Sequence, residues 1–195
     1  MLGVLDGFRN LGEFLVMTRS LYQHRPDAML EAERIYKFIG EYVVCFQWLE
    51  GRIDEIFLMA RGHKRRPETL SWLTRQTNDN KIKEFVKLIT SGVPFDPVCV
   101  DGWGERLQSV VGRLQNERRR RNGIMHAQFL FDFLPVNVPV LRLHLRHEND
   151  VPVFDQEYLS PQRCDQIIEE LAQLAFDLNM ICVQLRHSYR GPKSE

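Results

Sequence analysis

Apolar residues recur at steps of three and four along most of this chain, which is the spacing of amphipathic helices. The pattern holds from Glu31 to Arg61 for about eight turns, so we expect one long helix with a buried apolar stripe. An earlier stretch, Met1 to Gln23, predicts a first helix that ends before Pro26. Shorter helices are expected over 70–73 and 82–89.

Two further long helices are predicted in the second half of the chain. One starts near Asp101, taken as its N-cap, and carries one stripe formed by Trp103, Leu107, Val110, Leu114, Glu117 and Arg121. This spacing predicts that Arg121 points inward. The other helix begins at Ser160-Pro161, with serine as the N-cap and proline in the first turn, and keeps the same periodicity to about residue 188.

Between these helices the spacing changes to a period of two, which is typical of strands. Residues 138–147 and 151–155 predict a small β-hairpin, with Glu148-Asn149-Asp150 as its turn. The expected fold is therefore an all-α helical bundle with a small β-hairpin inserted before the last helix. We expect a single domain over 1–195, divided into an N-terminal helix (1–30), core helices (31–130), the hairpin insert (131–159) and a C-terminal helix (160–188).

Composition supports a compact domain and excludes two classes of protein. With 44% hydrophobic and 27% charged residues the chain does not have the composition of a disordered protein. Its formal net charge is zero, which excludes a uniformly basic nucleic-acid coat, so any attraction to RNA must come from local clusters at 61–66 and 118–121. Cys45, Cys164 and Cys182 fall in apolar helical patterns and are expected to be reduced core residues. No apolar stretch reaches the roughly 18 residues of a membrane span, so we expect a cytoplasmic protein.

The segment from Glu117 to Ala127 carries the most specific chemistry. Its four arginines offer permanent positive charge to phosphate, and His126 can exchange a proton near neutral pH. Arg121 and His126 are five residues apart, so they share a helix face only if the chain bends near Gly123. Asn122 and His126 are four apart and would share a face if the helix continued, which would let the amide orient the imidazole or the phosphate.

The stretch Arg121-Asn122-Gly123-Ile124-Met125-His126 resembles the R-x(4 to 6)-H motif of the HEPN family (higher eukaryote and prokaryote nucleotide-binding). Upstream, Phe46-Gln47-Trp48-Leu49-Glu50 is similar to the aromatic-x-x-Leu-Glu signature of the family's first long helix. The resemblance runs from about Glu31 to Arg186. It implies an α-helical bundle of HEPN type and a metal-independent endoribonuclease that leaves 2',3'-cyclic phosphate and 5'-hydroxyl ends, as in toxins and anti-phage abortive-infection effectors.

The resemblance also implies a homodimer, because the two motifs of such RNases converge on one cleft. Arg121 would stabilise charge on the phosphorane, His126 would act as acid or base, and Asn122 would position the scissile group. Glu50 either pairs with Arg121 and tunes His126 or lies at the edge of its stripe in solvent. Glu117 forms either a supporting pair with the site or a local helix-stabilising ion pair. RNA-binding candidates are Arg118, Arg119, Arg120, Arg65 and Arg66, of which the three on the helix spread around it.

No cofactor is expected, and no cysteine or histidine pair has metal-site spacing, so no metal site is predicted. An alternative function is a non-catalytic HEPN-like module that binds a nucleotide or a partner in a larger regulatory or defence assembly. An antitoxin or defence-system partner is compatible with both functions. In toxins that a nucleotidyltransferase partner silences, a tyrosine follows the motif histidine by two residues; Gln128 occupies that position here.

Overall fold

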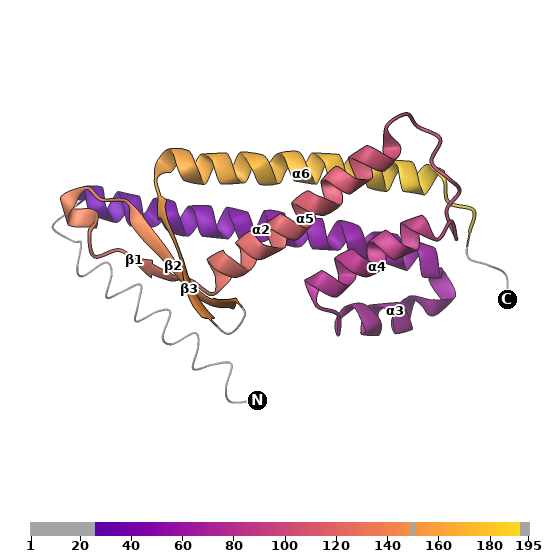
Figure 1. The fold of residues 1–195 in the computed structure, drawn as a ribbon, viewed down its shortest axis with the longest axis horizontal. Helices are drawn as coiled ribbons and strands as arrows, with labels where there is room; N and C mark the ends of the chain where they lie inside the picture. Colours follow the sequence, from indigo (N-terminus) through magenta and orange to yellow (C-terminus); the bar gives the residue numbers. More distant parts are fainter. Residues whose placement is uncertain (1–25, 149–150, 192–195) are drawn as a thin grey trace. The chain divides into compact units, whose positions relative to one another are not determined.

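The computed structural model describes residues 26–148 and 151–191, and it is mostly helical with one small sheet (Figure 1). This confirms a mainly α-helical fold class, while the HEPN type of bundle stays a prediction. The predicted helix over Met1 to Gln23 lies outside the described residues. Described residues group into two compact units: the first includes residues up to Ile39 and Ala127–Cys164, and the second includes Gly40–His126 and residues from Asp165 onward. The single-domain prediction stays a prediction.

Helix α2 (Pro26–Arg61) is the long helix expected from the periodicity. It is helical from Pro26, the first described residue, which lies five residues before the expected start. Its apolar stripe is buried as predicted, and the residues of that stripe with at most 4% exposure include Ile35, Phe38, Tyr42, Phe46, Leu49, Ile53 and Ile56. The helix ends at Gly62, whose φ of 78° is a left-handed value that glycine adopts without strain.

In the second unit, short helices α3 (Arg66–Leu73) and α4 (Asn78–Thr90) confirm the two predicted after the basic loop. A 3-10 turn, η1 (His63–Arg65), precedes α3. Helix α5 (Trp103–Met125) is the predicted fourth long helix, but Asp101 is not its N-cap. Gly102 occupies that position in a left-handed conformation and gives no side-chain cap.

In the first unit, strands β1 (Gln128–Leu130), β2 (Val140–Glu148) and β3 (Val151–Leu159) form an antiparallel sheet in the order β1-β2-β3. The predicted hairpin is confirmed, but β3 extends beyond the expected end at 155, and β1 adds a third strand that three residues of sequence were too short to reveal. Val140 lies opposite Leu159, and both are fully buried. Leu145 and its partner Phe154 are exposed.

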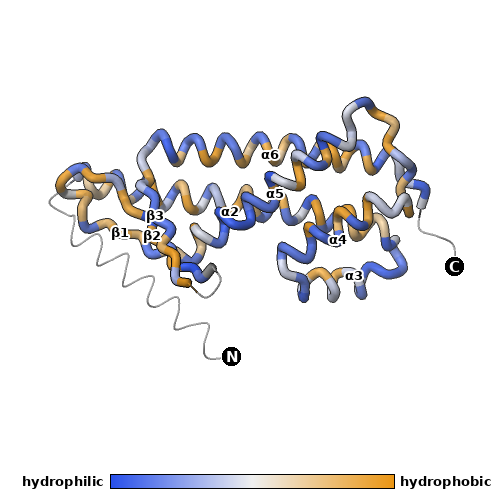
Figure 2. Tube along the Cα trace, viewed as in Figure 1, coloured by the Kyte–Doolittle hydropathy of each residue, from blue (hydrophilic) through white to orange (hydrophobic). Residues whose placement is uncertain are grey.

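Helix α6 (Pro161–His187) closes the described chain. Ser160 caps it as predicted, because its Oγ accepts a hydrogen bond of 3.2 Å from the Arg163 amide. Hydrophobic positions recur along this helix (Figure 2), and the most buried of them are Ile167, Leu171, Leu174, Leu178, Ile181 and Leu185. In the second unit α6 runs antiparallel to α5, since Arg113 pairs with Asp177 and Arg120 pairs with Glu170.

Cysteine burial follows the expectation for two of the three predicted core cysteines. Cys164 and Cys182 are buried, Cys45 is half-buried, and all three are free thiols. Burial raises the pKa of the Cys182 thiol to about 12. Among the described residues, no helix is long and apolar enough to cross a membrane.

Candidate functional site

The motif segment forms the C-terminal end of α5, and the helix continues through Gly123 to Met125. His126 is the C-cap residue, and its amide donates to the Asn122 carbonyl at 3.1 Å. On an ideal helix residues five apart differ by about 140° and about 7.5 Å. The Arg121 and His126 side chains of one chain therefore leave the helix in different directions.

Arg121 is half-buried rather than fully inward. Its Nη1 donates to Asn122 Oδ1 at 3.3 Å, and its guanidinium carbon lies 6.0 Å from the centre of the Phe46 ring on α2. Among the described residues, no carboxylate lies within ion-pairing distance of Arg121. The guanidinium contacts an amide and an aromatic ring, and no carboxylate of residues 26–148 and 151–191 pairs with it.

His126 and Asn122 differ in exposure, since the imidazole is exposed and the amide is half-buried. The side-chain oxygen of Asn122 accepts from Arg121 rather than contacting the imidazole, and its role in orienting a phosphate stays a prediction. Asn122 therefore contacts both motif residues: its backbone carbonyl accepts from the His126 amide, and its side-chain oxygen accepts from the Arg121 guanidinium.

Glu117 is the buried polar residue of α5, with 5% of its surface exposed. It accepts hydrogen bonds from Tyr42 Oη at 2.6 Å and from Arg120 Nη1 at 2.9 Å, and Arg120 also pairs with Glu170 at 2.7 Å. Burial, followed by the charge of Glu117, raises the pKa of Tyr42 well above its ordinary value. Of the two interpretations of Glu117, the local ion pair is therefore correct, and its partner is Arg120 rather than Arg121.

Sequence reasoning missed Tyr42 and Glu170 as members of this cluster. Tyr42 lies within the apolar stripe of α2, where its hydroxyl was the one available signal of a buried polar partner. Glu170 gave no signal, because it lies in a helix far along the sequence from Arg120.

The other two arginines of the α5 run also make contacts within their own chain. Arg118 pairs with Asp79 at 3.4 Å, and Arg119 donates to the Asn116 side chain at 3.3 Å. Glu50 is half-buried and accepts from Asn78 Nδ2 at 2.6 Å. The interpretation that Glu50 pairs with Arg121 is therefore wrong, since its hydrogen-bonding partner is on α4.

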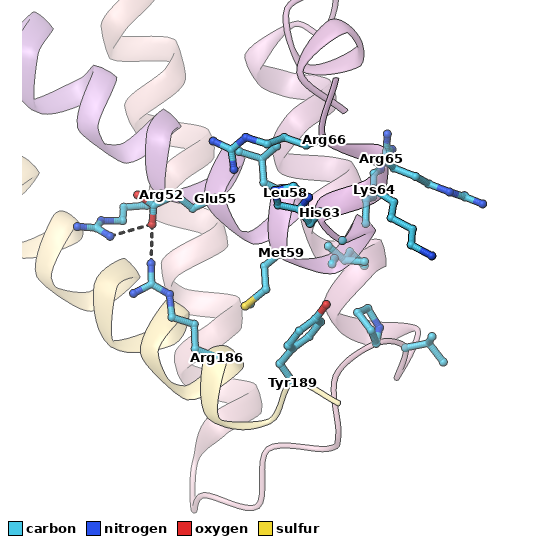
Figure 3. Close-up of a pocket in the computed structure, with 16 residues that line it drawn as sticks. Arg52, Glu55, Leu58, Met59, His63, Lys64, Arg65, Arg66, Arg186 and Tyr189 are labelled. Atoms are coloured by element: carbon cyan, nitrogen blue, oxygen red, sulfur yellow. Dashed lines mark hydrogen bonds and ion pairs between the residues drawn. The ribbon is translucent and has the colours of Figure 1, made fainter. Parts of the chain in front are cut away.

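Arg65 and Arg66 lie away from the motif and line a cavity of about 1350 Å³ at the C-terminal end of α2 (Figure 3). Arg61 also lines this cavity, and its guanidinium lies 4.0 Å from the centre of the Trp72 ring. The basic residues predicted to bind RNA thus divide into two separate places within the second unit.

No group of three or more histidine, cysteine, aspartate or glutamate side chains in residues 26–148 and 151–191 is arranged to hold a metal ion. The chemistry available at the motif is therefore that of a fixed guanidinium, an amide and an exposed imidazole.

Comparison with protein-family models, with curated proteins and with solved structures finds no match for this chain.

Proposed function

We propose that this protein is a metal-independent endoribonuclease of HEPN type, acting in the cytoplasm as a toxin or anti-phage defence effector. Its catalytic residues are Arg121, Asn122 and His126. One observation carries the proposal: at the end of α5, Arg121 keeps an unneutralised guanidinium tied to Asn122, and one turn beyond Asn122 His126 presents an exposed imidazole. The other arginines of the run are engaged by their own side-chain partners.

RNA cleavage of this kind needs no external reactant. The 2'-hydroxyl oxygen attacks phosphorus and loses its proton to a base, the bond from phosphorus to the 5'-oxygen breaks, and an acid protonates that oxygen. The products are a 2',3'-cyclic phosphate and a 5'-hydroxyl. A guanidinium stabilises the charge that accumulates on the phosphorane oxygens in between.

A second copy of the chain supplies what one copy lacks. A single imidazole cannot be base and acid in the same step. Because α5 is helical up to Met125, Arg121 and His126 of one chain are directed apart. A two-fold homodimer with the ends of both α5 helices at its axis places two imidazoles and two guanidiniums around one phosphodiester. An antitoxin or defence-system partner would act by covering this cleft, since Gln128 stands where an adenylated tyrosine would be needed.

The proposal is tested by incubating total RNA with the wild type, Arg121→Ala and His126→Ala in the presence of a chelator. We expect chelator-resistant cleavage by the wild type, a loss of about 10²- to 10⁴-fold in His126→Ala, which removes an acid–base group, and a loss of about 10²- to 10³-fold in Arg121→Ala, which removes a charge-stabilising group. The matched control is His187→Ala, which removes another exposed histidine from a helix end and should cleave at the wild-type rate.

Light scattering of the same samples measures the oligomeric state, and we expect a dimer. The proposed nuclease function would be overturned by a monomeric wild type, or by a His126→Ala variant that cleaves RNA as fast as the wild type. An inactive wild type that still binds nucleotide or a partner protein would favour the non-catalytic binding module.

A further inference from the structure

The cavity at the end of α2 is strongly cationic although the whole chain is formally neutral. Its lining includes one carboxylate, Glu55, and six permanent cations: Arg52, Arg61, Lys64, Arg65, Arg66 and Arg186. Helix C-termini attract cations, which accounts for Arg61 in the last turn of α2 but not for the basic residues that follow. The surplus of positive charge therefore points to an anionic ligand.

Internal ion pairs neutralise only part of this charge. Glu55 lies between Arg52 and Arg186, at 2.9 Å and 2.5 Å from their guanidinium nitrogens (Figure 3). In the part of the chain that the structure describes, Lys64 and Arg66 have no carboxylate within ion-pairing distance. The η1 turn that carries Lys64 contains no buried residue, so its side chains are not required for packing.

The remaining wall of the cavity is apolar and ends in an aromatic side chain. Leu58, Met59 and Pro94 line it, together with Tyr189 from the segment after α6 (Figure 3). Tyr189 is fixed in position, because it forms a β-bridge with Phe95 and their rings lie 5.9 Å apart. A positively charged groove combined with an aromatic side chain is the arrangement that binds single-stranded nucleic acid.

We propose that this cavity binds single-stranded RNA outside the cleavage site, with Lys64, Arg65 and Arg66 on phosphates and Tyr189 against a base. The inference deepens the proposed nuclease function and rests on it for the identity of the polymer. The cavity is larger than the roughly 300–1,000 Å³ of small-molecule pockets, which favours an extended ligand. Arg121 lies over Phe46, and Arg61 is 15 residues further along the same helix, so the basic end of the cavity lies about 22 Å along α2 from the motif.

Binding is measured with a fluorescent single-stranded oligoribonucleotide in the His126→Ala background, so that cleavage does not interfere. Replacing Lys64, Arg65 and Arg66 together with glutamine should weaken binding at least tenfold and lower the slope of log affinity against log salt by up to about 2. The matched control replaces three exposed cations outside the cavity, Arg75, Lys83 and Lys87, with glutamine. Tyr189→Leu should weaken binding about fivefold or more without changing the slope.

The inference is overturned if the cavity variant and the charge-matched control bind RNA equally well. It is also overturned if duplex RNA binds as tightly as the single strand, or if polyglutamate displaces RNA at equal charge, which would indicate an acidic protein partner. Cleavage by the otherwise wild-type protein separates the two proposals. If RNA binds through the cavity but is not cleaved, only the proposed nuclease function is contradicted. If RNA is cleaved and the triple replacement leaves KM unchanged, only the proposed RNA binding by the cavity is contradicted.

Discussion

Two basic clusters that look alike in the sequence are used differently in the structure. In the α5 cluster, residues 118–121, two arginines form ion pairs with carboxylates of their own chain. In the loop cluster, residues 61–66, Lys64 and Arg66 face the cavity without such partners among residues 26–148 and 151–191. A run of arginines therefore does not by itself indicate how much charge is available to a ligand.

The difference has a physical cause in the local structure. Arg118 and Arg120 of the α5 cluster are half-buried, so these two cations would be partly desolvated without counter-charges, whereas Arg119 is exposed. The loop cluster follows Gly62, where the chain leaves α2 and turns into solvent, and its cations stay hydrated. We expect the α5 cluster to contribute mainly to stability, with the exception of Arg121, and the loop cluster mainly to RNA affinity.

The largest expected effect comes from Glu117→Ala. It leaves Arg120 without its buried carboxylate and the fully buried Tyr42 hydroxyl without an acceptor for its shortest hydrogen bond. Removing one partner of a buried pair costs about 3–5 kcal/mol. Urea unfolding monitored by circular dichroism measures this loss.

Two variants sharpen that result. Glu117→Gln keeps an oxygen that accepts from Tyr42 and should lose less stability than the alanine variant. Glu169→Ala, at an exposed position of α6, should change the free energy of unfolding by less than about 0.5 kcal/mol. If Glu117→Ala is as stable as Glu169→Ala, the buried cluster is not a stabilising element.

The second prediction compares one arginine from each cluster. Arg120→Gln should lower the free energy of unfolding by about 2 kcal/mol, because Glu117 and Glu170 lose their shared cation. Arg66→Gln should leave stability within about 0.5 kcal/mol of the wild type and weaken RNA binding. Both changes remove one charge, so parallel unfolding and RNA titrations separate the two roles. Equal effects on stability would show that the clusters do not differ.

Periodicity predicted the long elements of the fold well, because helix α2 and helix α6 each bury one continuous stripe. It failed where single residues decide the local structure. The N-cap of α5 moved from Asp101 to Gly102, and β1 was too short to show a period.

The site was predictable only in part, for a related reason. Spacing along one helix correctly placed Glu117 in the buried stripe of α5. Spacing cannot show which distant element supplies a partner, so the contacts of Glu117 with Tyr42, of Glu50 with Asn78 and of Arg120 with Glu170 were not foreseen. The cavity joins α2 to the segment after α6, and only tertiary structure brings Tyr189 to the basic turn.

The third prediction concerns alkaline pH. The unfolded chain releases the phenolic proton of Tyr42 near pH 10, whereas the folded chain retains it because the pKa of Tyr42 is raised by burial and by Glu117. Stability from this group is therefore complete below about pH 10 and declines as the pH rises further, by about 1 kcal/mol between pH 10 and 11. Tyr42→Phe should lack this decline in urea unfolding, and the control Tyr158→Phe, at an exposed position, should retain it.

The smallest effect on the free energy of unfolding is expected from Arg118→Gln. This variant tests whether the ion pair of Arg118 with Asp79 contributes to stability. Arg118 and Asp79 are 3.4 Å apart, and both are about one quarter exposed, so solvent weakens their attraction. We expect a loss of at most about 0.5 kcal/mol, which disappears in molar salt. RNA affinity shows whether Arg118 also binds RNA. Weaker RNA binding by Arg118→Gln would extend the RNA-binding surface onto α5, because a guanidinium that is weakly bound to Asp79 can bind phosphate instead. Unchanged binding would confine the available charge to Arg121 and the loop cluster.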